Sequence, residues 1–201
     1  MGKIALILLF PVWIGSAGYV FWVFQLKHYG FFQKTEPIEW DNFDQVLREE
    51  LRKIPKGSLP MIVYFRDQKC LCSRYSDRRI AKIIGQYSEF RYVLVHAPGQ
   101  DDSFGEDDLS KLFESTLSRV AARRLWSLLP AGPVVAVIDR DMRVAYFGPY
   151  ESRNFCGGSK EGFVEATLVI LRRGEQIQNI NLWEKACFCP TRESIMETKR
   201  R

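Results

Sequence analysis

The stretch MIVYFRDQKCLCSRY (61–75) decides the fold class of this 201-residue chain. Its first five residues form a continuous apolar run, which is typical of a strand buried on both faces of a sheet. A short polar segment leads to Cys70 and Cys72, and apolar residues at helical spacing follow from about Ser73 to Tyr87. The stretch therefore predicts a buried strand, a loop with two cysteines and a helix in direct succession.

Upstream and downstream of this stretch, helices and strands alternate. An amphipathic helix is predicted between an Asp41 N-cap and the Pro55-Lys56-Gly57 stop, and Tyr92 to Ala97 predicts a second strand. A capping box at Ser103 and Glu106 predicts the start of another helix. The residues expected on the inward face of that helix are Leu109, Leu112, Phe113, Leu117, Val120 and Ala121.

The second half of the chain predicts a hairpin and a last helix. Val134 to Ile138 and Arg143 to Gly148 flank a polar turn, and Ser159 can cap the helix that follows. Alternating helices and strands, closed by a hairpin and a helix, indicate an α/β fold whose sheet has one antiparallel edge.

The amino-terminal stretch 4–26 contains no charged residue. Its 23 residues would form a helix of about 35 Å, enough to cross a hydrocarbon core of ~30 Å. We therefore expect an uncleaved transmembrane anchor rather than a signal peptide or a core helix, in a single-pass inner-membrane protein with a periplasmic domain. The predicted segments are a tail at 1–3, an anchor at 4–26, a juxtamembrane linker at 27–37, a domain at 38–173 and an extension at 174–201.

Composition and charge narrow the function classes. Lysine and arginine exceed aspartate and glutamate by 29 − 24 = 5, and both signs alternate along the chain, so no nucleic-acid partner is expected. With only His28 and His96 present, a histidine-rich metal site is excluded. Gly157-Gly158 indicates a turn rather than a phosphate-binding loop, and no cofactor is expected.

The five cysteines carry the functional argument. Cys70 and Cys72 form one Cys-x-Cys pair, Cys187 and Cys189 form another, and Cys156 is the fifth. The first pair lies at the expected start of a helix, where free amide groups and the helix dipole stabilise a thiolate. Positive charge from neighbouring side chains is expected to add to this effect, namely from Arg66, Lys69 and Arg74.

The stretches MIVYFRDQKCLCSRY (61–75) and PAGPVVAVIDRDMRVAYFG (130–148) resemble those of a thioredoxin-like domain. The resemblance covers about residues 38–173, and the whole chain resembles uncharacterised bacterial membrane-anchored thioredoxin-like proteins. It implies that Cys70 is the attacking cysteine and that Pro133 is a cis-proline facing the active site. The chain departs from that family in its Cys-x-Cys spacing and in having Lys69 where the family has tryptophan.

The remaining cysteines are less constrained by this resemblance. Its topology implies that the loop 149–159 lies on the active-site side, so that Cys156 is either a third thiol near Cys70 or a buried, inert cysteine. The extension from Gly174 to Cys189 could span up to about 50 Å, so it can reach the active site but is not required to do so.

Three functions fit these residues. The first is thiol-disulfide exchange on partner proteins, with Cys70 as nucleophile, Cys72 as resolving thiol and Pro133 shaping the groove for a partner strand. The second is a Cys₄ zinc or copper(I) site, and the third is a scaffold with structural disulfides within or between the Cys-x-Cys pairs. We take the first as the prediction, with protein thiols or disulfides as partners and the membrane contacted through the amino-terminal helix.

Overall fold

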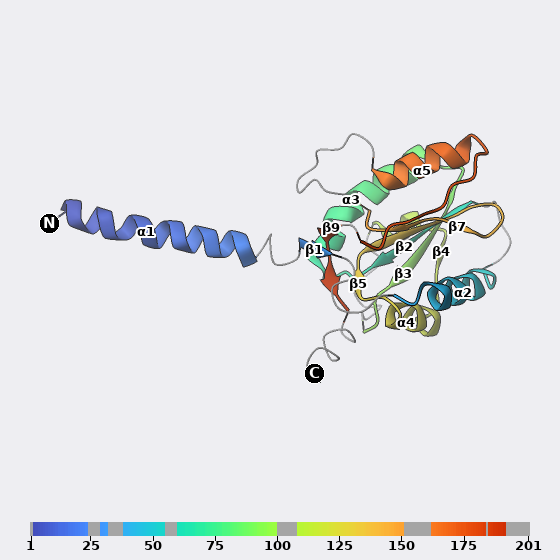
Figure 1. Cartoon of the computed structure of the whole chain (residues 1–201), viewed down its shortest axis with the longest axis horizontal. Coiled ribbons are helices and arrows are strands. Elements are labelled where there is room, and N and C mark those ends of the chain that lie inside the picture. The colour runs from blue at the N-terminus through green and yellow to red at the C-terminus, as the bar shows by residue number, and fades with distance from the viewer. Residues whose placement is uncertain are drawn as a thin grey trace.

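The computed structural model describes residues 2–23, 29–31, 38–54, 60–99, 108–150, 162–183 and 185–191. Its centre is a mixed six-stranded sheet in the order β4-β3-β2-β6-β7-β8 (Figure 1). The strands are β2 (Met61–Arg66), β3 (Arg91–His96), β4 (Ser115–Thr116), β6 (Val134–Ile138), β7 (Val144–Gly148) and β8 (Asn179–Ile180).

The sheet combines parallel and antiparallel pairs. β2 runs parallel to β3, β3 to β4 and β7 to β8, whereas β6 is antiparallel to both β2 and β7. Every residue of β2, β6 and β7 is buried, which explains why these strands are continuous apolar runs rather than alternating ones. The predicted buried strand, the hairpin and the mixed α/β class are confirmed. The expected antiparallel edge is corrected, because the antiparallel strand β6 lies inside the sheet between β2 and β7, and the edge strands β4 and β8 pair in parallel.

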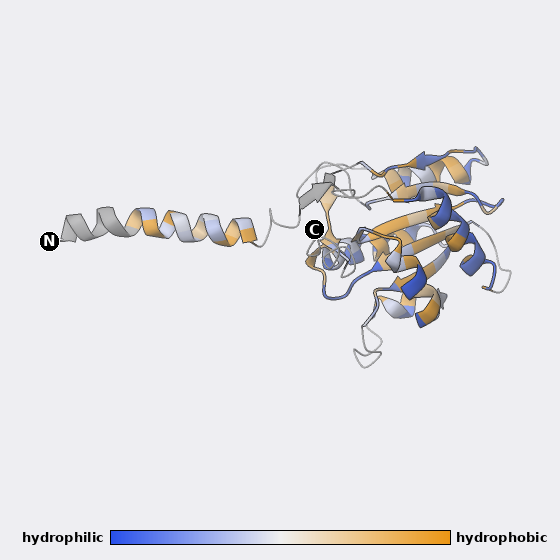
Figure 2. Cartoon of the chain, turned by 60° about the horizontal axis from the view of Figure 1, so that its bottom comes forward, coloured by the Kyte–Doolittle hydropathy of each residue, from blue (hydrophilic) through white to orange (hydrophobic). Residues whose placement is uncertain are grey.

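Four helices cover the two faces of the sheet. α2 (Trp40–Leu51) and α4 (Arg119–Ser127) pack on one face, around Phe43, Leu47 and Trp126. α3 (Leu71–Gln86) and α5 (Phe163–Arg172) pack on the other face, with Ile80 and Leu168 in the second core cluster. Figure 2 shows hydrophobic central strands between helices that are hydrophobic on one side and hydrophilic on the other.

Two short antiparallel pairs lie outside the main sheet. β1 (Tyr29–Phe31) pairs with β9 (Lys185–Cys187), and β5 (Ala131–Gly132) pairs with β10 (Cys189–Pro190). Both pairs join the carboxy-terminal extension to an earlier part of the chain.

The amino-terminal helix α1 (Gly2–Phe21) requires a correction. It contains Pro11, and its regular α-helical part spans Gly2–Phe21, whereas residues 24–26 of the expected anchor lie outside the described residues. Among the described residues, we find no helix with both the length and the apolar character needed to span a membrane. This finding corrects the prediction of a transmembrane anchor at 4–26 and of a single-pass inner-membrane protein.

The helix expected from Ser103 is also corrected in its described part. A short 3-10 helix (Ser110–Leu112) and the strand β4 stand where a continuous helix was predicted, and α4 begins only at Arg119. Consequently, Val120 is 79% exposed rather than inward. The backbone of this stretch pairs with β3 instead, because Glu114 and Leu117 donate their amides to carbonyls of that strand. The predicted capping box lies outside the described residues.

Helix α2 begins slightly earlier than its sequence suggested. Its N-cap is Glu39, whose side chain makes no capping hydrogen bond, and the expected cap Asp41 lies inside the first turn. A carboxylate in that position still interacts favourably with the helix dipole. The helix itself is therefore confirmed, with a corrected start.

Candidate four-cysteine site

The first Cys-x-Cys pair lies where β2 passes into α3. Cys70 is the N-cap residue of α3, in an extended conformation, and Cys72 lies in the first turn. The connecting loop is fixed by three hydrogen bonds: the Cys70 amide donates to the Asp67 carbonyl at 3.0 Å, the Lys69 amide to the Asp67 carboxylate at 2.9 Å, and the Asp67 amide to the Ser73 hydroxyl at 3.2 Å. The positions of both sulfurs are thus set by local structure.

The segment before β6 lies against Cys70. The Gly132–Pro133 peptide bond is cis, as predicted, and the Cys70 sulfur lies 3.9 Å from the Gly132 carbonyl oxygen. Gly132 has no room for a side chain, because a Cβ atom there would lie 2.6 Å from the indole ring of Trp126. The close approach of β5 to Trp126 therefore requires glycine at this position.

The carboxy-terminal extension returns to this same place. In the β5–β10 ladder, Cys189 lies opposite Gly132, and the Thr191 amide donates to the Pro130 carbonyl at 3.1 Å. Phe188 and Ala186 are each 5% exposed and belong to the main core cluster. The extension is therefore held by backbone pairing and by apolar packing as well as by its cysteines.

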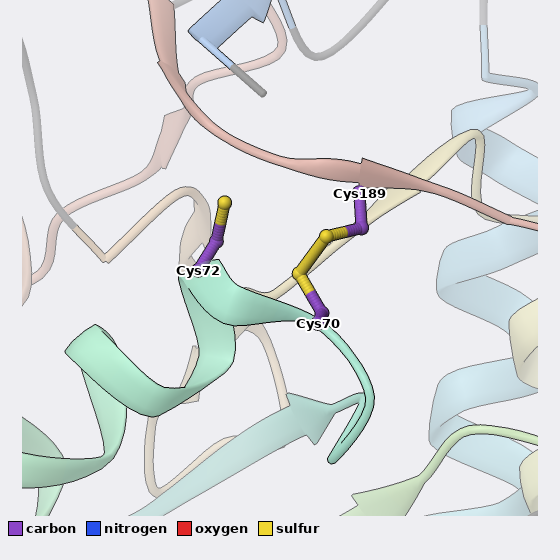
Figure 3. A group of neighbouring side chains, drawn as sticks. All are labelled: Cys70, Cys72 and Cys189. Carbon is purple, nitrogen blue, oxygen red and sulfur yellow. A yellow bond between two sulfur atoms is a disulfide. The ribbon is translucent and has the colours of Figure 1, made fainter. Parts of the chain in front are cut away.

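The two Cys-x-Cys pairs are joined to each other by disulfides. Cys70 is bonded to Cys189 with a Cα–Cα distance of 5.9 Å, and Cys72 to Cys187 with 5.4 Å. The sulfurs of Cys70, Cys72 and Cys189 all lie within 4.8 Å of one another. Figure 3 shows the three side chains, with Cys70 and Cys72 at the start of α3 and Cys189 on the extension. Pairing between the Cys-x-Cys motifs, which the sequence left open for a scaffold, replaces the Cys70–Cys72 couple expected for exchange.

The charges around the site differ from the sequence expectation. The positive charge of Arg66 is directed to Asp77 rather than to Cys70, because the guanidinium donates to both carboxylate oxygens of Asp77 at 2.8 to 3.1 Å. The hydroxyl of Tyr64 also donates to Asp77, at 3.0 Å, and burial raises the pKa of Tyr64 well above its usual value. This cluster joins β2 to α3 directly behind the cysteine loop.

The structure brings together Cys70, Cys72, Cys187, Cys189 and Pro133 from the predicted site residues. Cys156 lies outside the described residues. Sequence reasoning missed Gly132 and Asp77 as parts of the site and its support. A signal for Asp77 was available, because it lies among the inward residues of an amphipathic helix, whereas the role of Gly132 depends on the distant Trp126.

The fold and site define a mixed α/β domain in which four cysteines from two distant segments meet at the start of a helix. The chain belongs to a family described as a domain of unknown function, DUF6436, whose sequence profile matches residues 41–191. No curated protein matches the chain.

Two solved structures share the fold. One is an uncharacterised conserved protein from Geobacillus kaustophilus, with a TM-score of 0.50, 14% identity, and coverage of 67% of this chain and 77% of that one. The other is a hypothetical protein from Sinorhizobium meliloti 1021, with a TM-score of 0.50, 15% identity, and coverage of 75% and 82%. At this level of identity the similarity concerns the fold alone.

Proposed function

We propose that this chain is a thioredoxin-like protein that exchanges disulfides with the thiols of partner proteins. The observation that carries the proposal is the Cys70–Cys189 disulfide, which joins a buried helix N-cap to a more exposed segment beside the cis-proline. A disulfide with one accessible sulfur and one well-stabilised leaving group is suited to exchange.

Burial assigns different roles to the two sulfurs. Cys70 is only 2% exposed, whereas Cys189 is half-buried. A partner thiolate therefore attacks the Cys189 sulfur, the Cys70–Cys189 bond breaks, and its electron pair leaves as the Cys70 thiolate. Free amide groups in the first turn of α3 stabilise that charge. This order replaces the one suggested by the sequence, in which Cys70 itself meets the partner.

A second partner thiolate completes the reaction. It attacks the partner sulfur of the mixed disulfide and expels the Cys189 thiolate, so the partner gains a disulfide and the protein gains two electrons. In the reverse direction, the Cys70 thiolate resolves the mixed disulfide formed at Cys189. During either reaction, the intact Cys72–Cys187 disulfide keeps the extension beside α3.

Trapping of a mixed disulfide tests this order. The Cys70→Ser variant keeps Cys189 but lacks the thiol that resolves it. A peptide with one cysteine, supplied as its disulfide-linked dimer, should therefore accumulate on Cys189, because the Cys189 thiolate attacks the dimer and one peptide leaves as its thiolate. Cys72→Ser is the matched control, because it leaves the Cys70–Cys189 couple intact and should trap no peptide at Cys189. Acid quenching followed by mass spectrometry locates the adduct.

The competing function is a scaffold with two inert disulfides. Its support is the burial of Cys70 and Cys72, which are 2% and 1% exposed. If the native protein keeps both disulfides for hours with excess peptide dithiol at neutral pH, while the unfolded protein loses them, the exchange proposal is wrong and the scaffold is correct.

A further inference from the structure

The sulfur cluster has the composition of a thiolate metal site. Cys70, Cys72 and Cys189 have their three sulfurs within 4.8 Å of one another, and the sulfur of Cys187 is bonded to that of Cys72. Four thiolates form a soft ligand set, which selects zinc over the hard cations magnesium and calcium. We propose that the protein with both disulfides reduced binds one Zn²⁺ through these four cysteines.

Three of the four sulfurs already lie close enough for one tetrahedral ion, whereas the Cys187 sulfur, which is bonded to that of Cys72, is not part of the group within 4.8 Å and has to move toward it. A Zn–S bond of about 2.3 Å places the sulfurs of a tetrahedral site about 3.8 Å apart. A disulfide holds its two sulfurs closer together than that, so the sulfurs of each bonded pair have to separate when the ion binds. Rotation about the cysteine side-chain bonds is the movement that this separation requires.

Contacts other than the disulfides keep the ligands together. Cys70 and Cys72 lie at the start of α3, and the loop before them is held by hydrogen bonds of Asp67 and Ser73 that do not involve the sulfurs. On the other segment, Cys189 is held opposite Gly132 in the β5–β10 ladder, and the neighbouring Phe188 is 5% exposed in the main core. The reduced protein thus retains contacts that hold both ligand pairs near each other.

The surroundings also favour the charge of the site. Four thiolates and one Zn²⁺ carry a net charge of −2, and the helix N-terminus that positions Cys70 and Cys72 stabilises negative charge. Zinc binding releases protons from the thiols, so the affinity should rise with pH. The binding itself transfers no electrons; only the prior reduction of the disulfides requires a dithiol or phosphine reductant.

Metal titration of the reduced full chain tests the proposal. The protein is reduced with a phosphine, freed of metal and titrated with Zn²⁺ against a chromophoric chelator, and separately with Co²⁺, whose thiolate charge-transfer and d–d bands report ligand type and geometry. We expect one ion per chain and a tetrahedral, thiolate-rich cobalt spectrum. The oxidised protein should bind neither ion at this site.

Variants separate this site from adventitious thiol binding. Cys70→Ser and Cys189→Ser should each weaken zinc binding by at least 100-fold, whereas Cys156→Ser, which removes the cysteine outside the proposed set, should bind like the wild type. Phe188→Ala keeps all four ligands but removes the core packing that holds Cys187 and Cys189 in place. It should weaken zinc binding by about 10–100-fold. Circular dichroism of each reduced variant establishes that it is folded.

Failure of this proposal is distinguishable from failure of the exchange function. Absence of a 1:1 zinc complex in folded, reduced protein, or wild-type affinity in Cys70→Ser and Cys189→Ser, overturns the metal site. Neither result bears on peptide trapping at Cys189, because that assay is carried out with chelator present and without metal.

Discussion

The two Cys-x-Cys pairs have the same spacing but very different structural support. Cys70 and Cys72 lie on α3, whose 16 residues pack against the sheet, and both are almost completely buried. Cys187 and Cys189 lie on two short strands, β9 and β10, which pair only with the equally short β1 and β5. The first pair, Cys70 and Cys72, belongs to the packed domain. The second pair, Cys187 and Cys189, belongs to the carboxy-terminal extension, which is attached to that domain.

This difference shows what the disulfides join. The two segments approach each other in opposite directions, so the earlier cysteine of one pair bonds to the later cysteine of the other. Helix α3 supplies fixed sulfurs, and the extension supplies sulfurs whose position depends on Phe188 packing and on a few backbone hydrogen bonds. Reduction of a disulfide is therefore expected to alter the position of the extension more than the structure of the domain.

Removal of both disulfides should have the largest effect on stability. The Cys70→Ala/Cys72→Ala double variant loses crosslinks that close loops of 119 and 115 residues, which should cost about 4–5 kcal/mol in the free energy of unfolding. Either single variant should lose about 1 kcal/mol or less, because the remaining disulfide closes almost the same loop. Urea unfolding of the oxidised proteins measures these values.

The same proteins under reducing conditions provide the control for the substitutions themselves. There the wild type and the variants should differ only by the loss of buried sulfur atoms. If the two single variants each lost about half of the double variant's stability under oxidising conditions, the disulfides would be acting independently and the comparison of the two pairs would need revision.

A substitution at Gly132 tests how the extension is fastened. In Gly132→Ala the new methyl group would lie 2.6 Å from the Trp126 ring, so β5 must shift and β10 with it. Overpacking of this kind should lower the free energy of unfolding by about 1–3 kcal/mol. Hydrogen exchange of the Thr191 amide, which bonds to Pro130 in this ladder, should become faster.

Gly85→Ala is the matched control for that variant. Gly85 lies in α3 with nothing within 4 Å of its Cβ position, so alanine there should stabilise the protein by about 0.5–1 kcal/mol. If hydrogen exchange of the Thr191 amide were unchanged in Gly132→Ala, the Trp126 side chain would have moved instead of β5. The proposal that Gly132 holds β5 and β10 in place would then be wrong.

The smallest expected effect concerns the segment that carries Cys70 and Cys72, where the hydrogen bond between Tyr64 and Asp77 joins β2 to α3. Burial raises the pKa of Tyr64 in the folded protein above its value of about 10 in the unfolded chain. The stability that the neutral phenol contributes is therefore fully present below about pH 10, and it is lost as the pH rises above that value. The expected slope from this group is up to about 1.4 kcal/mol per pH unit.

The Tyr64→Phe variant should lose that part of the alkaline slope, whereas Tyr75→Phe, a change at a side chain that is 59% exposed, should retain it. Unfolding by urea between pH 8 and 11 measures both. Parallel slopes for the wild type and Tyr64→Phe would show that the phenol does not contribute to holding α3 on the sheet at alkaline pH.

The parts of the fold that local patterns specify were predictable. The apolar run 61–65, the helix after Cys72 and the hairpin at 134–148 were all confirmed, because a strand buried on both faces leaves a continuous apolar run and a buried helix face leaves apolar residues at helical spacing. The stretch from Leu109 to Ala121 was mispredicted because its apolar spacing suited a helix, while pairing with β3 provided a competing structure. The prediction for residues 4–26 relied on the absence of charged residues, but no helix in the described part of the chain is both long and apolar enough to span a membrane.

By itself, the sequence determined the mixed α/β class and the placement of Cys70 and Cys72 between a buried strand and a helix. The cis bond at Pro133 was implied by the resemblance to a thioredoxin-like domain, and the structure has it. Only the tertiary structure decided which cysteines are bonded, because four cysteines allow three pairings and their spacing favours none of them. The choice depends on contacts between residues more than 50 positions apart, such as Gly132 with Cys189 and Phe188 with the main core. Such contacts are created by packing and leave no local pattern in the chain.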